Sequence, residues 1–370
     1  MSKAQETILE IHLDALTHNY NYLKSKLNPK TKILAVVKAF AYGSDAIAVA
    51  KHLQNLDVDY FAVAYTREGV LLRDAGVTKP ILVLHPQVVN FKTIIERCLE
   101  PSIYSSRVLK TFIEVAEKEK QSKYPIHIKF NTGLNRLGFW HKDVEFIVKQ
   151  LKNTTSIIAK SLFSHLAASE DKNESNFTTN QINDFKSIAS NFESQIGYKP
   201  WLHLSNTSGV INYPEAHLDM VRCGIGLYGF GNTANEDQNL KPIANLKSII
   251  SQIHLIEKDE TVGYNRAYKA KGFEKTATIP IGHADGISRQ FGNEKGFVFI
   301  NGQKAPIIGN VCMDMIMVNI TGVDCKEGDE VIIFDENHKA SALADSVNTI
   351  SYEVLTSISQ RVKRVFIITT

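Results

Sequence analysis

The sequence predicts an α/β protein, a (β/α)8 barrel of the TIM type followed by a mostly antiparallel β domain. Short apolar runs alternate with amphipathic helical stretches from residue 33 to about residue 230, as in a barrel of parallel strands. Several of these runs are apolar at every position, which is typical of strands covered on both faces. After residue 240 the pattern changes to alternating strands and hairpin turns, which indicates a second domain.

Eight candidate strands lie in the first part of the chain. They are ILAVV (33–37), YFAVA (60–64), ILVLH (81–85), SIYS (102–105), IHIKF (126–130), KSLFSH (160–165), WLHLS (201–205) and MVRCG (220–224). Stretches between them, such as VNFKTIIERC and RVLKTFIEVAEKEK, carry apolar residues at helical spacing. Eight strands joined by crossover helices predict a closed barrel, although a doubly wound open sheet fits the same alternation.

The second part of the chain follows a polar stretch, NTANEDQNLKP, which begins at Asn232 and indicates a linker. Beyond it, GFVFINGQKAPIIGN contains the hairpin dipeptide Asn301-Gly302 between two β runs. Helical patterning is sparse there, except around SYEVLTSIS. We therefore expect a barrel domain over residues 12–236 and a β domain over residues 237–370. The strand-like segment 7–13 is expected to belong to the β domain.

Composition and charge exclude several classes of protein. With 44% hydrophobic and 22% charged residues the chain is ordinary for a globular protein, and its net charge of +3, without a basic run between aromatics, predicts no nucleic-acid partner. The four cysteines are scattered without metal-ligand spacing, which predicts free thiols in a reducing compartment and no metal site. We expect a cytoplasmic protein, because no apolar stretch is long enough for a signal peptide or for the ~18 residues of a membrane span.

Ionisable and small residues recur at the carboxyl ends of the predicted strands, where barrel enzymes place their active sites. These residues are Lys38, Lys129, Arg136, His165, Ser205, Arg222 and Gly224-Ile225. The charged members predict one pocket that binds an anionic ligand. The loops Ser205–Gly209 and Gly224–Gly226 follow the seventh and eighth strands, where barrels commonly bind phosphate through N–H groups and a hydroxyl. Either loop alone is also ordinary turn chemistry.

Lys38 follows the first strand in AVVKAFAYGSDA. A lysine there is costly to bury, so its amine either extends to solvent or serves as a Schiff-base lysine whose pKa desolvation lowers. A phosphate site together with such a lysine predicts pyridoxal 5'-phosphate as the cofactor.

The stretch AVVKAFAYG resembles the cofactor-lysine signature of the alanine racemases, usually AVVKANAYG. The resemblance extends along nearly the whole chain, through FNTGLNRLGF, SHLAASED, HLSNTSG, VRCGIGLYG, VGYNRAY, PIGHADG, GNVCMDM and ISYEVLTSISQRVKR. It implies a fold-type III enzyme, a cytoplasmic homodimer that interconverts L-alanine and D-alanine and supplies D-alanine for peptidoglycan.

The resemblance also implies how the cofactor is held. Lys38 would form the internal aldimine, and Arg222 would face the pyridine nitrogen. The phosphate contacts would be Tyr42, Ser205, Gly224, Ile225 and Tyr352. An always-charged guanidinium discourages protonation of the pyridine nitrogen, which favours prompt reprotonation of the substrate over side reactions such as transamination.

Racemisation needs a base on each face of the reacting carbon. By resemblance these are Lys38 and Tyr264 of the partner subunit, with His165 and Arg222 as a relay that lowers the tyrosine pKa from its usual ~10. Arg136 would steer the cofactor phenolic oxygen and the substrate carboxylate.

Three further positions have implied roles around the substrate. Lys129 resembles a lysine that many members carry as a carbamate, which would orient the arginine. Met313 and Asp314 would approach the substrate from the partner chain, whereas the adjacent Cys312 is expected to be a packed thiol.

The chain departs from the family pattern at four positions. Phe40 stands for an asparagine, Asn131 for an aspartate, Cys223 for a proline and His283 for a tyrosine. These changes leave the catalytic groups in place but affect pocket shape, the substrate corridor and turnover.

Three related enzymes or carriers are alternatives. A broad-specificity amino-acid racemase shares the fold but is typically exported. A decarboxylase of this architecture would want an acidic residue at Arg222 and a glycine-rich phosphate loop. A non-catalytic pyridoxal-phosphate carrier lacks the β domain and therefore has no counterpart of Tyr264.

Overall fold

The computed structural model describes residues 4–368 and divides into two compact units. One unit takes the chain up to Leu16, the segment Tyr42–Asp45 and the chain from Lys241 onward. The other, called the barrel unit, takes Thr17–Ala41 and Ala46–Leu240. Both ends of the chain therefore belong to the first unit, called the sheet unit.

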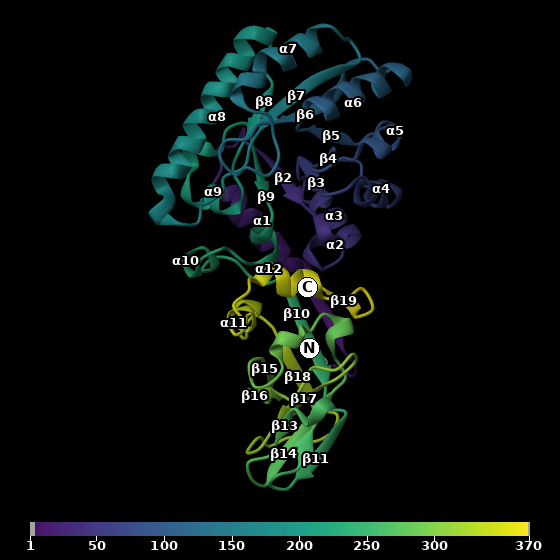
Figure 1. The fold of residues 1–370 in the computed structure, drawn as a ribbon, viewed down its shortest axis with the longest axis vertical. Coiled ribbons are helices and arrows are strands. Elements are labelled where there is room, and N and C mark those ends of the chain that lie inside the picture. The colour runs from purple at the N-terminus through teal and green to yellow at the C-terminus, as the bar shows by residue number, and fades with distance from the viewer. Residues whose placement is uncertain (1–3, 369–370) are drawn as a thin grey trace. The chain divides into compact units, whose positions relative to one another are not determined.

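Within the described residues, eight parallel strands close into a barrel in the order of the sequence (Figure 1). They are β2 (Lys32–Val36), β3 (Tyr60–Val63), β4 (Ile81–Val83), β5 (Glu100–Ile103), β6 (Tyr124–Lys129), β7 (Ile157–Phe163), β8 (Trp201–His203) and β9 (Met220–Cys223). Each expected run contributes one strand, which confirms the barrel and excludes the open sheet. Strand β5, the fourth of the barrel, begins at the buried Glu100, two residues before the run SIYS that predicted it.

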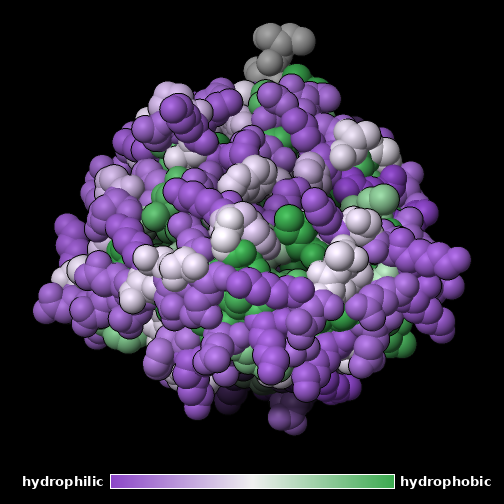
Figure 2. Space-filling view, turned by 90° about the horizontal axis from the view of Figure 1, so that it is seen from above, coloured by the Kyte–Doolittle hydropathy of each residue, from purple (hydrophilic) through white to green (hydrophobic). Residues whose placement is uncertain are grey.

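Helices cover the outside of the barrel strands in Figure 1. The helices that follow one another in this part of the chain are α1 (Leu13–Ser25), α3 (Ala46–Asn55), α4 (Thr66–Asp74), α5 (Phe91–Glu96), α6 (Ser106–Lys118), α7 (Val144–Lys152), α8 (Ser175–Ile196), α9 (Thr207–Asn212) and, away from the barrel strands, α10 (Ala234–Asp237). In α6 the side chain of the N-cap Ser105 accepts from the Val108 N–H, and Leu109, Phe112 and Ala116 form the buried face. The face seen in Figure 2 is mostly hydrophilic, with apolar residues showing mainly near its centre.

The stretch expected to be a polar linker contains the short helix α10. Its Glu236 is buried and accepts hydrogen bonds from Ser208 Oγ, Asn212 Nδ2 and the Asn232 N–H. This carboxylate fastens the segment to the barrel unit. The polar composition gave no sign of it, because a buried carboxylate depends on donors that are distant in sequence.

The sheet unit is built on a nine-stranded sheet of the described residues, in the order β11-β14-β17-β16-β15-β18-β10-β1-β19. Its strands are β1 (Ile8–His12), β10 (Ala244–Ile249), β11 (Gln252–Ile256), β14 (Glu274–Ile279), β15 (Phe297–Ile300), β16 (Gln303–Ile308), β17 (Ile316–Asn319), β18 (Glu330–Phe334) and β19 (Lys363–Ile367). Every neighbouring pair is antiparallel except β1 and β19, so the predicted antiparallel character is confirmed.

Local patterns identified two elements of this unit. Strands β15 and β16 form the predicted hairpin, because Asn301 and Gly302 both take the positive φ that its turn requires. Helix α12 (Ser351–Ser357) forms in the SYEVLTSIS stretch, whereas α11 (Ala340–Asp345) is too short for a periodic pattern. A short pair, β12 (Thr261–Val262) and β13 (Tyr268–Lys269), flanks Tyr264.

All four cysteines are free thiols, as expected. Over residues 4–368, no helix has both the length and the apolar character needed to cross a membrane.

Candidate active site

Lys38 follows the end of β2 and begins α2 (Lys38–Tyr42), a short left-handed turn. Ala39, Phe40, Ala41 and Tyr42 have φ angles of 52°, 55°, 51° and 53°, so four consecutive non-glycine residues are left-handed. Each such residue costs roughly 1–2 kcal/mol, so other contacts must hold the turn.

Glu68, in the first turn of α4, holds the start of this turn. One of its carboxylate oxygens accepts from the Ala39 N–H at 2.6 Å, and the other accepts from the N–H groups of Ala64 and Tyr65 at 2.7 and 3.0 Å. One carboxylate thus ties the residue after Lys38 to the end of β3. The sequence reasoning missed Glu68, although a glutamate three residues into a helix is a known capping signal.

The Lys38 amine is set for covalent chemistry. Its burial, together with the neighbouring Arg136 cation, lowers the pKa of Lys38 below the ordinary lysine value, although Glu68 acts in the opposite direction. A lowered pKa leaves more of the amine unprotonated, and the unprotonated amine is the form that attacks a carbonyl.

Further cations surround this amine. Lys129 is the last residue of β6 and only 8% exposed, and burial followed by the charges of Arg222, Arg136 and Lys38 lowers its pKa to about 8. Arg136 is exposed on the loop after β6, and its guanidinium has no hydrogen bond or ion pair with any described residue. The charges of Lys38, Arg136 and Arg222 all act on Lys129, so the four cations lie near one another.

Arg222, on β9, is the most constrained of these cations. Its Nη1 donates to His203 Nδ1 at 3.0 Å, and its Nη2 donates to the carbonyls of Ser164 and Leu204 at 2.7 and 3.0 Å and to His165 Nδ1 at 2.9 Å. These partners fix the plane of the buried guanidinium but carry no negative charge. Its charge therefore stays available to a ligand.

His165 follows β7 and contacts the same guanidinium. Since arginine only donates, the His165 Nδ1 is an acceptor and the ring proton lies on Nε2. Burial and the Arg222 charge hold the pKa of His165 well below its ordinary value, so the ring stays neutral. Gln181 of α8 positions this loop, accepting from the Ala167 N–H at 2.9 Å and donating to the His165 carbonyl at 3.3 Å.

The two loops expected to bind phosphate lie together. Thr207 Oγ1 accepts from the N–H groups of Gly224 and Gly226 at 3.3 and 3.2 Å. The N–H of Ile225, which opens the 3-10 helix Ile225–Tyr228, has no partner among the described residues. The Ser205 hydroxyl donates to the Ala216 carbonyl at 2.8 Å, so it must rotate to donate to a ligand.

The expected phosphate tyrosines lie in the sheet unit. The rings of Tyr42 and Tyr352 are 5.9 Å apart. Burial and the neighbouring Tyr352 raise the pKa of Tyr42, so its phenol stays protonated and able to donate.

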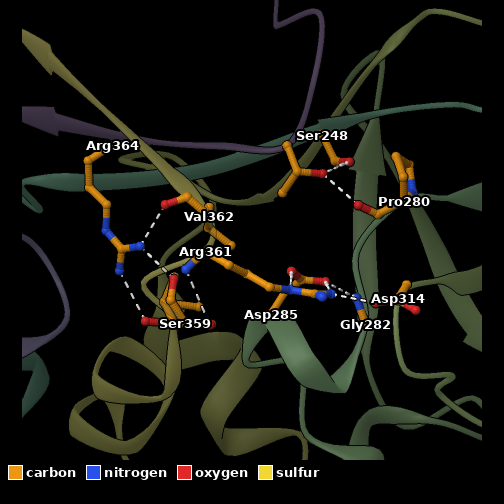
Figure 3. A network of polar contacts seen from close by, with 11 residues as sticks. Ser248, Pro280, Gly282, Asp285, Asp314, Ser359, Arg361, Val362 and Arg364 are labelled. Carbon is orange, nitrogen blue, oxygen red and sulfur yellow. Dashed lines mark hydrogen bonds and ion pairs between the residues drawn. The ribbon is translucent and has the colours of Figure 1, made fainter.

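The residues expected to act from a partner subunit are exposed on the sheet unit. Tyr264 is 75% exposed and Met313 is 59% exposed. Asp314 is less free, because Arg361 Nη2 donates to its carboxylate at 2.6 Å while also pairing with Asp285 (Figure 3). This ion pair fixes the loop that carries Met313.

The departures from the family pattern have local structural consequences. Asn131 organises the loop before Arg136, because its Oδ1 accepts from the N–H groups of Gly133 and Asn135 at 3.2 and 2.9 Å. Burial raises the pKa of Cys223 to about 12, which makes it an inert thiol. The pKa of Cys312 is also raised by burial, as for a packed thiol. The His283 N–H donates to the Cys312 carbonyl at 2.9 Å.

Comparison with known proteins identifies this architecture. The family model of the alanine racemase N-terminal domain matches residues 11–231, and that of the alanine racemase C-terminal domain matches residues 243–366. The chain belongs to the alanine racemase family. As a member of this family it is an isomerase.

Full-length relatives agree with this membership. Alanine racemase 2 of Caldanaerobacter subterraneus subsp. tengcongensis is 34% identical over 370 residues, covering 98% of this chain and 95% of the relative. An alanine racemase of Clostridium difficile 630 is 35% identical with a TM-score of 0.92, covering 100% of this chain and 97% of that chain. The alanine racemase from Bacillus anthracis with bound L-Ala-P is 29% identical with a TM-score of 0.91, covering 99% of this chain and 96% of that chain.

Proposed function

We propose that this chain interconverts L-alanine and D-alanine with pyridoxal phosphate bound at the carboxyl end of its barrel, supplying D-alanine for peptidoglycan. The observation that supports this most directly is the cluster of Lys38, Lys129, Arg136 and Arg222, whose charges act on one another. A second is the N–H of Ile225, which has no partner among the described residues. An amine that carbonyls can reach, surrounded by cations and N–H donors, suits a phosphorylated aldehyde. When bound, pyridoxal phosphate withdraws electrons from the amino-acid Cα and makes its proton acidic.

The proposed cofactor contacts follow from these donors. Lys38 would hold the aldehyde carbon and Arg222 would donate to the pyridine nitrogen, a direction that its always-protonated guanidinium enforces. The phosphate would be held by Tyr42, Ser205, Gly224, Ile225 and Tyr352. The Ile225 N–H supports this assignment because a buried donor without a partner is uncommon.

The proposed proton transfers use one base on each side of the substrate Cα. Lys38 would act on one face and Tyr264 of the partner subunit on the other. His165 supports the second role, because its Nδ1 accepts from Arg222 and its Nε2–H remains to donate. A donated hydrogen bond and the nearby cations stabilise a phenolate and lower a tyrosine pKa.

Arg136 and Lys129 would position the substrate. The exposed Arg136 guanidinium, which has no partner among residues 4–368, is suited to a substrate carboxylate. With a pKa of about 8, Lys129 has a fraction of free amine near neutral pH, which can add carbon dioxide and release a proton to form a carbamate. That anion would offset the surrounding positive charge and orient Arg136. Met313 and Asp314 of the partner subunit would border the substrate.

We also propose a homodimer in which each site uses both subunits. The exposure of Tyr264 and Met313 supports it, because large apolar side chains at a solvent face commonly mark an interface. In this proposal residues 12–236 form the cofactor domain, and residues 237–370 with the strand 7–13 form the domain that reaches the partner's site.

Chiral analysis of alanine tests the activity. The wild-type protein loaded with pyridoxal phosphate should bring L-alanine to equal amounts of both enantiomers, with L-serine much slower. Equal rates on both amino acids would instead support the broad-specificity racemase. Loss of all D-alanine formation in a protein that holds the cofactor would contradict the proposed function.

Proton exchange in D2O tests the two bases separately. Tyr264→Phe should abolish exchange of the Cα proton from one enantiomer while leaving the other exchangeable, because each base serves one face. Tyr65→Phe, which removes another exposed phenol, is the control and should exchange both. Equal loss for both enantiomers would argue against a separate role for Tyr264.

A further inference from the structure

A chain of hydrogen-bonded side chains extends from Arg222 across neighbouring strands of the barrel. Arg222 Nη1 contacts His203 Nδ1 at 3.0 Å, and His203 Nε2 contacts Ser161 Oγ at 2.9 Å. Ser161 Oγ contacts His127 Nδ1 at 2.6 Å, and His127 Nε2 contacts Glu100 Oε2 at 2.7 Å. The five residues lie on five consecutive strands, β5 to β9, and all are buried.

With His127 neutral, the two ends of the chain set the direction of every hydrogen bond. Arg222 has only donors, so His203 Nδ1 must accept and the His203 proton must lie on Nε2. The Nε2–H then donates to Ser161, whose hydroxyl donates to His127 Nδ1. The proton of His127 therefore lies on Nε2 and donates to Glu100, which as a carboxylate only accepts. The reverse order would direct a His203 N–H at an arginine N–H.

Glu100 is held as a stable acceptor. Tyr60 Oη donates to the same Oε2 at 2.9 Å, and Lys160 Nζ donates to Oε1 at 2.9 Å. Burial by itself would raise the pKa of Glu100, but the hydrogen bonds from His127 and Lys160 and the charge of Lys160 outweigh it and lower the pKa below the ordinary glutamate value. The carboxylate therefore stays ionised near neutral pH and remains an acceptor.

His203 is held at the other end by packing as well as by hydrogen bonds. Its ring stacks on Phe163 with centroids 4.8 Å apart and planes 7° apart, so the imidazole cannot rotate without losing that contact. Burial and the Arg222 charge hold the pKa of His203 well below its ordinary value, which keeps the ring neutral.

We propose that Glu100, His127 and Ser161 are positioning residues that fix His203 as its Nε2–H tautomer and thereby hold the Arg222 guanidinium in place. If His203 carried its proton on Nδ1, that atom would have no lone pair to accept the Arg222 Nη1–H. The buried Nη1–H would then lack this acceptor, and the guanidinium would shift toward another acceptor. This inference rests on the proposed function, in which Arg222 donates to the cofactor's pyridine nitrogen. A shift of the guanidinium would weaken that donation.

Ser161→Ala tests the relay, because it deletes one atom in the middle of the chain. The matched control is Ser102→Ala, since Ser102 is equally buried in β5 and its hydroxyl has no partner among the described residues. In the holoenzyme we expect Ser161→Ala to lower kcat on the order of 10- to 100-fold with little change in KM, as small displacements of catalytic groups do. The control should match wild type.

The absorption spectrum of the bound cofactor gives a readout independent of turnover. Its pH dependence should shift in Ser161→Ala and stay unchanged in Ser102→Ala, because only the first alters the group facing the pyridine nitrogen. Ser161→Thr keeps the hydroxyl and should restore the wild-type spectrum. A wild-type spectrum and wild-type kcat in Ser161→Ala would overturn the proposal.

Nitrogen NMR of histidine-labelled protein measures the tautomer directly. The His203 signals, assigned through a His203→Gln variant, should show Nε2 protonated in wild type and a mixture of tautomers in Ser161→Ala. A wild-type proton on Nδ1 would overturn the relay. If the protein held the cofactor but did not racemise alanine, the proposed function would fail while these signals still tested the relay.

Discussion

At the residue scale, the buried cations link the site to the stability of the fold. Lys129 is the clearest case, since it is 8% exposed and its pKa is lowered to about 8. The unfolded chain has a lysine pKa of ~10.4 and binds more protons between these two values. The contribution of Lys129 to the free energy of unfolding therefore rises as pH increases from about 8 to about 10.4.

Lys129→Met should stabilise the cofactor-free protein at pH 7 by about 3 kcal/mol, because it removes a buried cation but keeps the length of the side chain. The gain should shrink to less than about 1 kcal/mol at pH 10, where the wild-type amine is neutral in the folded state and partly neutral in the unfolded state. Urea unfolding in buffer free of carbon dioxide measures both values.

Lys51→Met is the control for this measurement, since Lys51 is exposed on α3 and the same change there should stay within about 0.5 kcal/mol at both pH values. A stabilisation by Lys129→Met that did not depend on pH would contradict a titrating amine as its source.

At the element scale, the left-handed turn after Lys38 is the most strained segment near the site. Phe40 has a φ of 55°, and the family usually carries asparagine there, a residue that tolerates this conformation better. The aromatic residue therefore costs backbone energy that an asparagine largely avoids. The Glu68 carboxylate and the hydrogen bond from the Ala41 N–H to the Val37 carbonyl oppose that cost.

Phe40→Gly should be more stable than Phe40→Ala by about 1 kcal/mol, because both remove the ring but only glycine relieves the left-handed strain. Unfolding of the two cofactor-free variants in urea compares them directly. In an ordinary right-handed helix alanine would be the more stable, so the opposite order would show that the turn is not left-handed in solution.

At the scale of the whole molecule, the proposed site needs two chains. Coexpression of Lys38→Ala with Tyr264→Phe should produce mixed dimers in which one of the two sites keeps both bases. With random pairing, activity should recover to about a quarter of wild type, although each variant alone is nearly inactive.

The control for this complementation is coexpression of two Lys38→Ala chains carrying different affinity tags, which should remain inactive. No recovery in the mixed dimers, with dimers present, would mean that Lys38 and Tyr264 act within one chain.

Local patterns in the sequence determined much of this protein. The alternation of short strand-like runs with helical stretches identified all eight barrel strands, and Asn301-Gly302 identified the hairpin of β15 and β16. The position of Lys38, Lys129 and Arg222 at strand ends was enough to predict a common site, because all parallel strands of a barrel end on the same side.

Only the tertiary structure decided how distant residues pair. It inserted β1, from the start of the chain, between β10 and β19 of the sheet. It gave Ala39–Tyr42 a left-handed conformation, which depends on the carboxylate of Glu68 from another element. His127, Ser161 and His203 were visible only as polar residues in strands otherwise apolar. Their continuous hydrogen-bond chain depends on the register of neighbouring strands, which one-dimensional patterns do not specify.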